Sequence, residues 1–163
     1  MPVTPERPQI SVRVALAFDF GLKRIGVAVG DTLTQSAAPR GAIAVHASGP
    51  DWVAIERLVA ANAPHVLVVG APYNVDGDAS EMSARARQFA VELAARCLET
   101  AAEWGPTRPE TFRDLRRVCD RLGDVDRGYC ACAVLVHLGE ADVEEQEIYR
   151  RFAPETTPRP RAP

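Results

Sequence analysis

Two short segments near the start of the chain alternate between apolar residues and small or polar ones. The first covers residues 12–18 and the second residues 25–29, and in both the apolar residues recur at every second position. This period is typical of β-strands that bury one face. Only five residues, 20–24, lie between Asp19 and the second segment, and Gly21 among them supplies the backbone freedom of a tight connection. The pattern therefore predicts an antiparallel hairpin.

A single carboxylate, Asp19, stands at the end of the first predicted strand. An ionised carboxylate beside the core of a sheet is costly unless a partner offsets its charge. One hypothesis is that Asp19 caps the turn by accepting hydrogen bonds from backbone N–H groups. The other hypothesis is that Asp19 binds a cation. The local sequence leaves both open.

Strand-like and helix-like segments follow one another after the hairpin. The continuous apolar residues at 66–69 suit a strand that is buried on both faces of a parallel or mixed sheet. Asp51 is expected to cap a helix that ends before Pro64, and the helix between two strands predicts a right-handed crossover. The further elements that we expect are a strand over 41–46 and helices over Ser80–Cys97, Pro109–Leu122 and Arg127–Leu138. The last of these, rich in small residues, is expected to pack tightly on the sheet.

Composition limits the class of protein. A chain of 163 residues with 47% hydrophobic residues is large enough for one domain with a real core. The net charge of −3 does not by itself indicate a nucleic-acid-binding protein, so such a function needs a local basic patch. The sequence lacks a long apolar run and a recognisable secretory leader, so we expect a soluble, cytoplasmic protein without a membrane partner.

The four cysteines are expected to be reduced thiols, because nothing in the sequence indicates secretion. Cys130 and Cys132 are too close together, and too far from other ligands, for a tetrahedral zinc site. His46 is expected to be a solvated residue at a strand end, and His137 a buried or rim residue of its helix, rather than metal ligands. Residues 1–11 form a proline-containing leader, and residues 140–163 an acidic segment followed by a proline-rich tail that we expect to be disordered.

Three stretches resemble one known family. Residues 18–31, FDFGLKRIGVAVGD, resemble the opening hairpin of the YqgF family, described as pre-16S rRNA nucleases and as Holliday-junction-resolvase-like proteins. Residues 69–77, VGAPYNVDG, resemble the family's V-G-x-P-x-N-x-D-G motif, and residues 83–90 resemble the start of its next helix. The resemblance implies an α/β, RNase H-like domain over residues 12–139. Its central mixed sheet would begin with an antiparallel meander and carry flanking helices.

The resemblance also implies a metal site for Mg²⁺ or Mn²⁺ made of three carboxylates. Asp19 matches the first ligand. Trp104 stands where the family has its glutamate, so Glu103 is a displaced candidate for the second ligand. Asp126 matches the third, although it could simply cap the helix that follows. After residue 97 the match weakens. Three explanations of the weaker match stay open. The metal site has been rebuilt in this chain, part of the site has been lost, or the residues after 97 do not represent the ancestral reading frame.

The implied activity is a metal-dependent endonuclease that processes the 5′ end of pre-16S rRNA, with structured junction DNA as a weaker substrate proposal. The residues expected to contact nucleic acid are Lys23, Arg24, Asn74, Arg85 and Arg87, and the arginines of 109–122 form a further basic surface. Two alternatives stay open: a catalytically weakened nucleic-acid-binding protein of the same fold, and a relative of the actin and sugar-kinase ATPases. The latter need two such domains, and this chain has room for one.

Overall fold

The computed structural model describes residues 13–72 and 80–152. The chain divides into two compact units, Met1–Arg87 and Gln88–Pro163, and each unit is described by itself below. The predicted leader, Asn74 and the proline-rich tail lie outside the described residues. None of the helices among the described residues is long and apolar enough to cross a membrane.

The first unit begins with the predicted antiparallel hairpin. Strand β1 covers Val14–Asp19 and strand β2 covers Arg24–Asp31. Phe18 lies opposite Val27, and Asp19 lies opposite Gly26. This register puts the large apolar residues of both strands on one face, so the alternation in the sequence is confirmed as the alternation between the two faces of a sheet.

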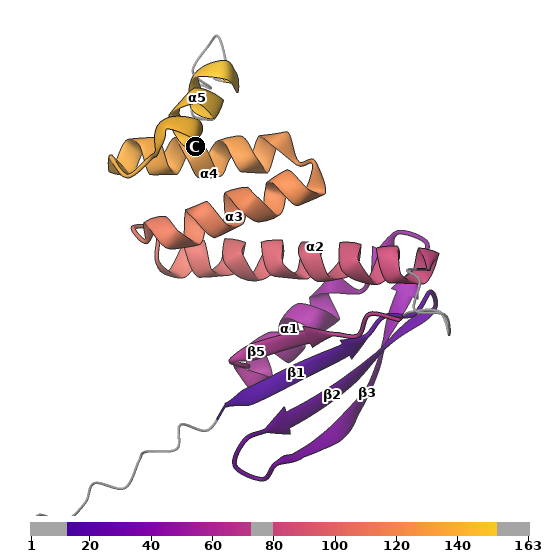
Figure 1. Cartoon of the computed structure of the whole chain (residues 1–163). Coiled ribbons are helices and arrows are strands. Elements are labelled where there is room, and N and C mark those ends of the chain that lie inside the picture. Colours follow the sequence, from indigo (N-terminus) through magenta and orange to yellow (C-terminus); the bar gives the residue numbers. More distant parts are fainter. Residues whose placement is uncertain (1–12, 73–79, 153–163) are drawn as a thin grey trace, which may run out of the picture. The chain divides into compact units, whose positions relative to one another are not determined.

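Three further strands complete the sheet among the described residues, in the order β4-β3-β2-β1-β5 (Figure 1). Strand β3, Ser36–His46, begins five residues before the predicted start and pairs with β2 through a bulge at Val27 and Ala28. Strand β4 is only Gly49–Pro50, and β5 is Val66–Val69, as predicted. Because β5 runs parallel to β1 while the other pairs are antiparallel, the sheet is mixed, which confirms the predicted fold class.

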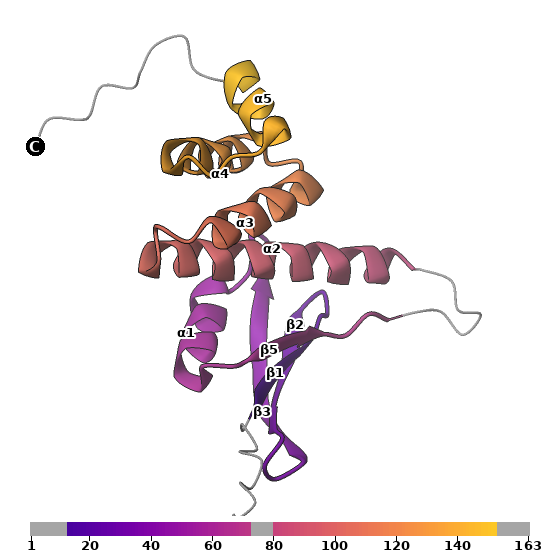
Figure 2. The same ribbon diagram turned by 60° about the vertical axis from the view of Figure 1, so that its left-hand side comes forward.

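Helix α1, Trp52–Asn62, connects the antiparallel strands to β5. The Asp51 carboxylate accepts a hydrogen bond from Ala54 N at 3.0 Å, and the helix ends at Ala63 in the left-handed conformation, just before Pro64. Both predicted ends of this helix are therefore confirmed. The helix contacts β1 and contributes the buried Ile55, and it lies on one side of the sheet in Figure 2.

The two faces of the sheet differ sharply. One face carries the large residues that are buried, which are Leu16, Phe18, Ile25, Val27 and Ile43. By alternation, the other face carries residues that are small or partly exposed, which are Ala15, Ala17, Gly26, Ala28, Ala42, Ala44, Val66 and Val68. The second set is referred to below as the open face. The prediction that β5 is buried on both faces is wrong, because Val66 and Val68 are 45% and 46% exposed.

The second unit is helical. It contains the greater part of α2 (Glu81–Trp104), followed by α3 (Pro109–Leu122), α4 (Val125–Leu138) and α5 (Val143–Phe152). Helix α3 has the predicted bounds. Helix α2 continues seven residues beyond the predicted end at Cys97, because Leu, Glu and Ala in that stretch favour a helix. Helix α5 forms within the acidic segment, where no element was predicted.

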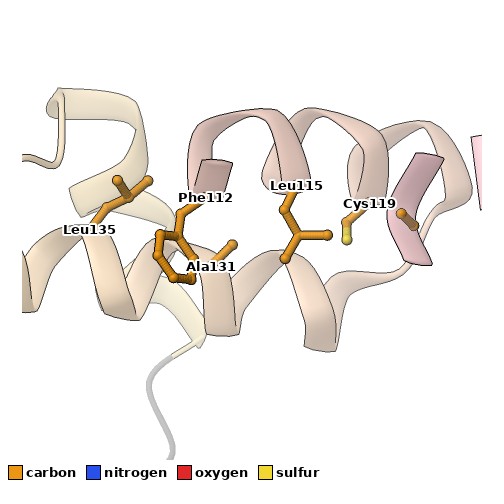
Figure 3. Packing of buried hydrophobic residues seen from close by; sticks show 6 residues of the cluster. Phe112, Leu115, Cys119, Ala131 and Leu135 are labelled. Carbon is orange, nitrogen blue, oxygen red and sulfur yellow. The ribbon is translucent and has the colours of Figure 1, made fainter. Parts of the chain in front are cut away.

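The core of the helical unit lies between α3 and α4 (Figure 3). Its buried residues are Ala95, Phe112, Leu115, Cys119, Ala131 and Leu135. A Cβ atom at Gly128 would lie 3.6 Å from the Cβ of Cys119, so the glycine brings the two helices close together. Gly128 of α4 therefore lies in the contact of this helix with α3. The packing of α4 on the sheet stays a prediction.

Arginine side chains of α3 that were predicted to face solvent are largely held by ion pairs within this unit. Arg116 is buried, and its guanidinium lies 2.9 Å from Asp120 Oδ2 and 3.9 Å from the buried Glu145. Arg113 lies 3.7 Å from the same glutamate. The prediction that Arg116 points outward is wrong because acidic residues on α3 and α5 draw it inward. The basic surface expected on this helix is thus largely neutralised by internal pairs.

All four cysteines are free thiols. Cys119 and Cys132 are buried, and burial raises the pKa of the Cys132 thiol to about 11. A thiol that stays protonated at neutral pH is a poor metal ligand.

Asp124, rather than Asp126, caps helix α4. Its Oδ1 accepts a hydrogen bond from Arg127 N at 3.0 Å, and its Oδ2 accepts one from Arg127 Nε at 2.6 Å. The same guanidinium donates to Glu99 and Glu92 of α2 at 3.1 and 3.2 Å. The alternative that Asp126 is the cap is wrong because the helix begins one residue before Asp126.

The pairing of Asp124 predicts how the stability of the helical unit depends on pH. The hydrogen bonds from Arg127 hold the pKa of Asp124 below its usual range. The stability that this carboxylate contributes is therefore fully present above its unfolded pKa of about 4, and is lost as the pH falls through the lower folded pKa. We expect Asp124→Asn to melt at a lower temperature than wild type at pH 7. The difference should shrink below about pH 4, and a constant difference in circular dichroism melts would contradict this assignment.

Candidate functional site

The carboxylate of Asp19 lies at the carboxyl end of β1, on the open face of the sheet. The side chain is exposed, and it accepts no hydrogen bond and makes no ion pair with any residue that the structure describes. By contrast, Asp31 caps the next turn, between β2 and β3, where it accepts hydrogen bonds from Leu33 N and Thr34 N at 2.9 and 2.7 Å. The bond from Thr34 lowers the pKa of Asp31. Among the described residues Asp19 therefore caps no turn, and its binding of a cation stays a prediction.

Asp19 borders a shallow depression of about 460 Å³ on the open face. Its floor is made by Ala17, Gly26 and Ala28, and Val68 and Gly70 of the β5 side form one wall. Apart from Asp19, every residue that lines the depression is apolar. The carboxylate is thus a single negative charge beside a smooth apolar surface.

Glycines keep the space around the Asp19 carboxylate clear. A Cβ atom at Gly70 would lie 3.6 Å from Asp19 Oδ1, and one at Gly26 would lie 3.5 Å from the Asp19 Cβ. Both distances are ordinary van der Waals contacts, so a methyl group would fit but would fill the space beside the oxygens. The glycines therefore leave room for a ligand to approach the carboxylate.

Two cations lie on the same hairpin as Asp19. Lys23 and Arg24 are exposed, and neither forms an ion pair with a described residue. Arg24 precedes Gly26 by two positions, so its side chain belongs to the open face together with Asp19. Asp19 and Arg24 thus carry opposite charges on the same face of the hairpin without forming an ion pair.

The other predicted ligands belong to the helical unit. Glu103 is exposed in the last turn of α2. The neighbouring Trp104 is 88% exposed. Asp126 is exposed in the first turn of α4. No three His, Cys, Asp or Glu side chains among the described residues form a group that could hold a metal ion. The roles of Glu103 and Asp126 as metal ligands stay predictions.

The predicted nucleic-acid contacts of helix α2 differ from those of the hairpin. Arg85 lies 2.7 Å from Glu81 on the same exposed helical face, so much of its charge is offset locally. Arg87 is also exposed. Because Arg85 has an acidic neighbour and Lys23 does not, we expect the hairpin cations to attract a phosphate backbone more strongly.

The sequence reasoning missed the lining of the depression. Gly70 was expected to allow a close backbone approach in the loop after the strand, but Ala17, Gly26, Ala28 and Val68 were not singled out as site residues. A signal was nevertheless present, because small residues alternate strictly with large ones in both strands of the hairpin. Such an alternation indicates one packed face and one face to which something else comes close.

The comparisons with known proteins agree with this arrangement. The family model described as RuvX: Holliday junction resolvase matches residues 13–105, more than half of the chain. A protein of Pseudomonas putida named "Putative pre-16S rRNA nuclease" is 46% identical over 85 residues, which are 52% of this chain and 60% of that protein. Proteins of the same name from Enterobacter sp. and Coxiella burnetii are 47% identical over 81 and 83 residues.

The mixed sheet, with its antiparallel meander and parallel fifth strand, is an RNase H-like arrangement. The chain belongs to the RuvX family. The matched residues include the whole sheet and Asp19, and they end at residue 105, just after Glu103 and before Asp126. The match spans about 60% of the length of the curated relatives, so their activity is carried to this chain only as a proposal.

Proposed function

We propose that this protein is a metal-dependent endonuclease that hydrolyses phosphodiester bonds of precursor 16S rRNA near its 5′ end. The observation that carries the proposal is the Asp19 carboxylate. It is exposed, it makes no hydrogen bond or ion pair with the described residues, and it borders a depression on a hairpin within the matched part of the chain. The names of the relatives supply the substrate class.

The residues of the hairpin fit a divalent metal ion. Carboxylate oxygens are the hard ligands that Mg²⁺ and Mn²⁺ prefer, and both oxygens of Asp19 are available among the described residues. Such an ion supplies activated water and stabilises the leaving oxygen of a phosphodiester. Asp19 would hold the ion. We propose Glu103 and Asp126 as the further ligands, and replacing each of them by its amide tests this proposal.

The remaining residues of the site would bind and orient the substrate. Lys23 and Arg24 would each contact a phosphate, since both cations are exposed and without an acidic partner among the described residues. Arg24 shares the open face with Asp19, so a phosphate that it holds lies on the side of the sheet where the carboxylate is. The apolar floor offers no competing polar groups.

The direct test is cleavage of a 5′-labelled precursor 16S rRNA fragment by the full chain. We expect cleavage with Mn²⁺ or Mg²⁺ and none with a chelator. A four-way DNA junction of similar length serves as the second substrate, because the family is described as a Holliday junction resolvase. Cutting of the junction alone would retain the nuclease and replace its substrate. Cutting of neither substrate with either metal would overturn the proposal.

One observation favours a second function, that of a nucleic-acid-binding protein without catalysis. Trp104 occupies the position where a glutamate was expected, and the described residues contain no group of three possible metal ligands. In this case the protein would bind the rRNA fragment with either metal and leave it intact. Binding measured by fluorescence anisotropy alongside the cleavage assay separates the two functions.

The hairpin cations give a prediction about binding that holds for both functions. We expect the double substitution Lys23→Ala, Arg24→Ala to weaken RNA binding. It should also reduce the slope of the logarithm of the binding constant against the logarithm of the salt concentration by about 1.4, because each contact with a single-strand phosphate adds about 0.7 to that slope. The control is Arg57→Ala, which removes an exposed cation from α1. Equal effects of the two variants on the slope would show that the hairpin has no special role.

A further inference from the structure

Strand β5 forms one edge of the sheet. It pairs with β1, and no other described strand lies on its outer side. The backbone hydrogen bonds of the flanking residues also go to β1, from His65 N to Val14 O and from Gly70 N to Phe18 O. In a parallel pair, alternate N–H and C=O groups of each strand point away from the partner. The outer edge of β5 therefore presents unpaired backbone groups.

The two edges of the sheet are protected to different degrees. The opposite edge consists of the two-residue strand β4, which ends in Pro50, and of the rest of β3, which carries Pro39 and Arg40. Strand β5 reads Val-Leu-Val-Val, with no charged residue, proline or bulge. Val66 and Val68 are also 45% and 46% exposed. Charged residues, prolines and bulges are the devices that keep edge strands from pairing with other chains, and β5 has none of them.

We propose that β5 pairs antiparallel with β5 of a second copy of this chain, which joins the two sheets into one. Two copies of one strand that are related by a two-fold axis run antiparallel and present the same edge to each other, so each strand can pair with its own copy. Pro64 and Pro72 bracket the edge, and the midpoint between them is Val68. The register that sets Val68 opposite Val68 of the second copy thus sets Pro64 opposite Pro72 and Val66 opposite Gly70.

The sequence of the edge suits this partner. Between the prolines the paired stretch contains no Asp, Glu, Lys or Arg, so the two-fold axis brings no like charges together. Val66 and Val68 of both copies would form one continuous apolar patch. Within the chain itself, the described residues after β5 are helical, so they supply no strand to cover this edge. Other copies of the chain are present wherever the protein is, so a second copy is the partner that we propose.

Edge pairing is independent of the proposed nuclease. It uses the outer side of β5, whereas Asp19 projects from the open face of β1. Val68 and Gly70 belong both to the pairing stretch and to the lining of the depression, but the carboxylate and the hairpin cations are not part of the stretch. The dimer can therefore be tested, and can fail, without bearing on cleavage.

The test is sedimentation velocity of the full chain over a range of concentrations. We expect reversible dimerisation for wild type. Val68→Lys places two like charges directly opposite each other, and we expect it to weaken the dimer about tenfold or more. The control Ala44→Lys adds the same charge to the exposed open face on β3, away from the edge, and should leave dimerisation unchanged.

Two results would overturn the proposal. One is a monomer at every concentration, and the other is equal weakening by Val68→Lys and Ala44→Lys, which would indicate pairing through the open face. Hydrogen–deuterium exchange on wild type gives a readout that does not depend on variant folding. Amide protection of Val66–Val69 should rise with protein concentration, and protection that stays constant would equally contradict edge pairing.

Discussion

Asp19→Asn is expected to lower the rate of metal-dependent RNA cleavage by roughly 10³-fold. The amide keeps the shape of the side chain but removes the negative charge that would hold the cation. A metal ion stabilises the transition state of such a reaction by several kcal/mol. Each loss of about 1.4 kcal/mol of this stabilisation lowers the rate tenfold. Because the described residues give Asp19 no hydrogen bond to lose, the substitution should not destabilise the sheet. The measurement is single-turnover cleavage of the labelled precursor rRNA fragment with Mn²⁺.

The matched control is Asp51→Asn, the same chemical change at the N-cap of α1. Asparagine caps helices as well as aspartate does, so the hydrogen bond to Ala54 N should persist. Cleavage by this variant should equal that of wild type. If Asp19→Asn cleaves as fast as Asp51→Asn, the carboxylate of Asp19 does not take part in the reaction. Glu103→Gln and Asp126→Asn in the same assay then test the two predicted ligands of the helical unit.

Leu16→Ala is expected to destabilise the first unit by about 2–5 kcal/mol, the usual cost of removing a fully buried leucine side chain. Leu16 is 0% exposed at the centre of the sheet, on the face that α1 packs against. A domain is stable by only about 5–15 kcal/mol, so this loss is a large fraction of the total. Urea unfolding followed by circular dichroism measures it.

Val68→Ala is the control on the opposite face of the same sheet. Its side chain is 46% exposed, so truncation should cost less than about 1 kcal/mol. The pair of variants thus measures the difference between the buried and open faces. Similar losses for Leu16→Ala and Val68→Ala would contradict the description of a sheet with one packed face.

The elements that are determined by neighbouring residues, through alternation, turn length and helix caps, were predicted correctly from the sequence. The hairpin follows from period-two alternation and a connection of four residues between β1 and β2. The ends of α1 follow from a capping aspartate and a proline. The strand β5 was also predicted, but its exposure was not, because a continuous apolar run does not say whether a strand lies at the edge or the centre of a sheet.

The predictions that failed depend on side-chain pairing and on helix boundaries that the hydrophobic pattern does not specify. Arg116 was predicted to point outward with the other arginines of α3, yet acidic residues of α3 and α5 hold it inside. The cap of α4 was misassigned between two nearby aspartates, Asp124 and Asp126, because the choice depends on where the helix begins. Asp19 was the site residue that the sequence predicted on two independent grounds, a charge at a strand end and the family resemblance.

Paramagnetic broadening by Mn²⁺ tests the central claim, that Asp19 binds a divalent metal, without requiring catalysis. In two-dimensional NMR of the full chain, low amounts of Mn²⁺ should broaden the amide signals nearest the carboxylate, those of Asp19, Gly26 and Gly70. The same titration of Asp19→Asn should leave these signals sharp. Broadening that appears elsewhere, or that survives the substitution, would contradict the account.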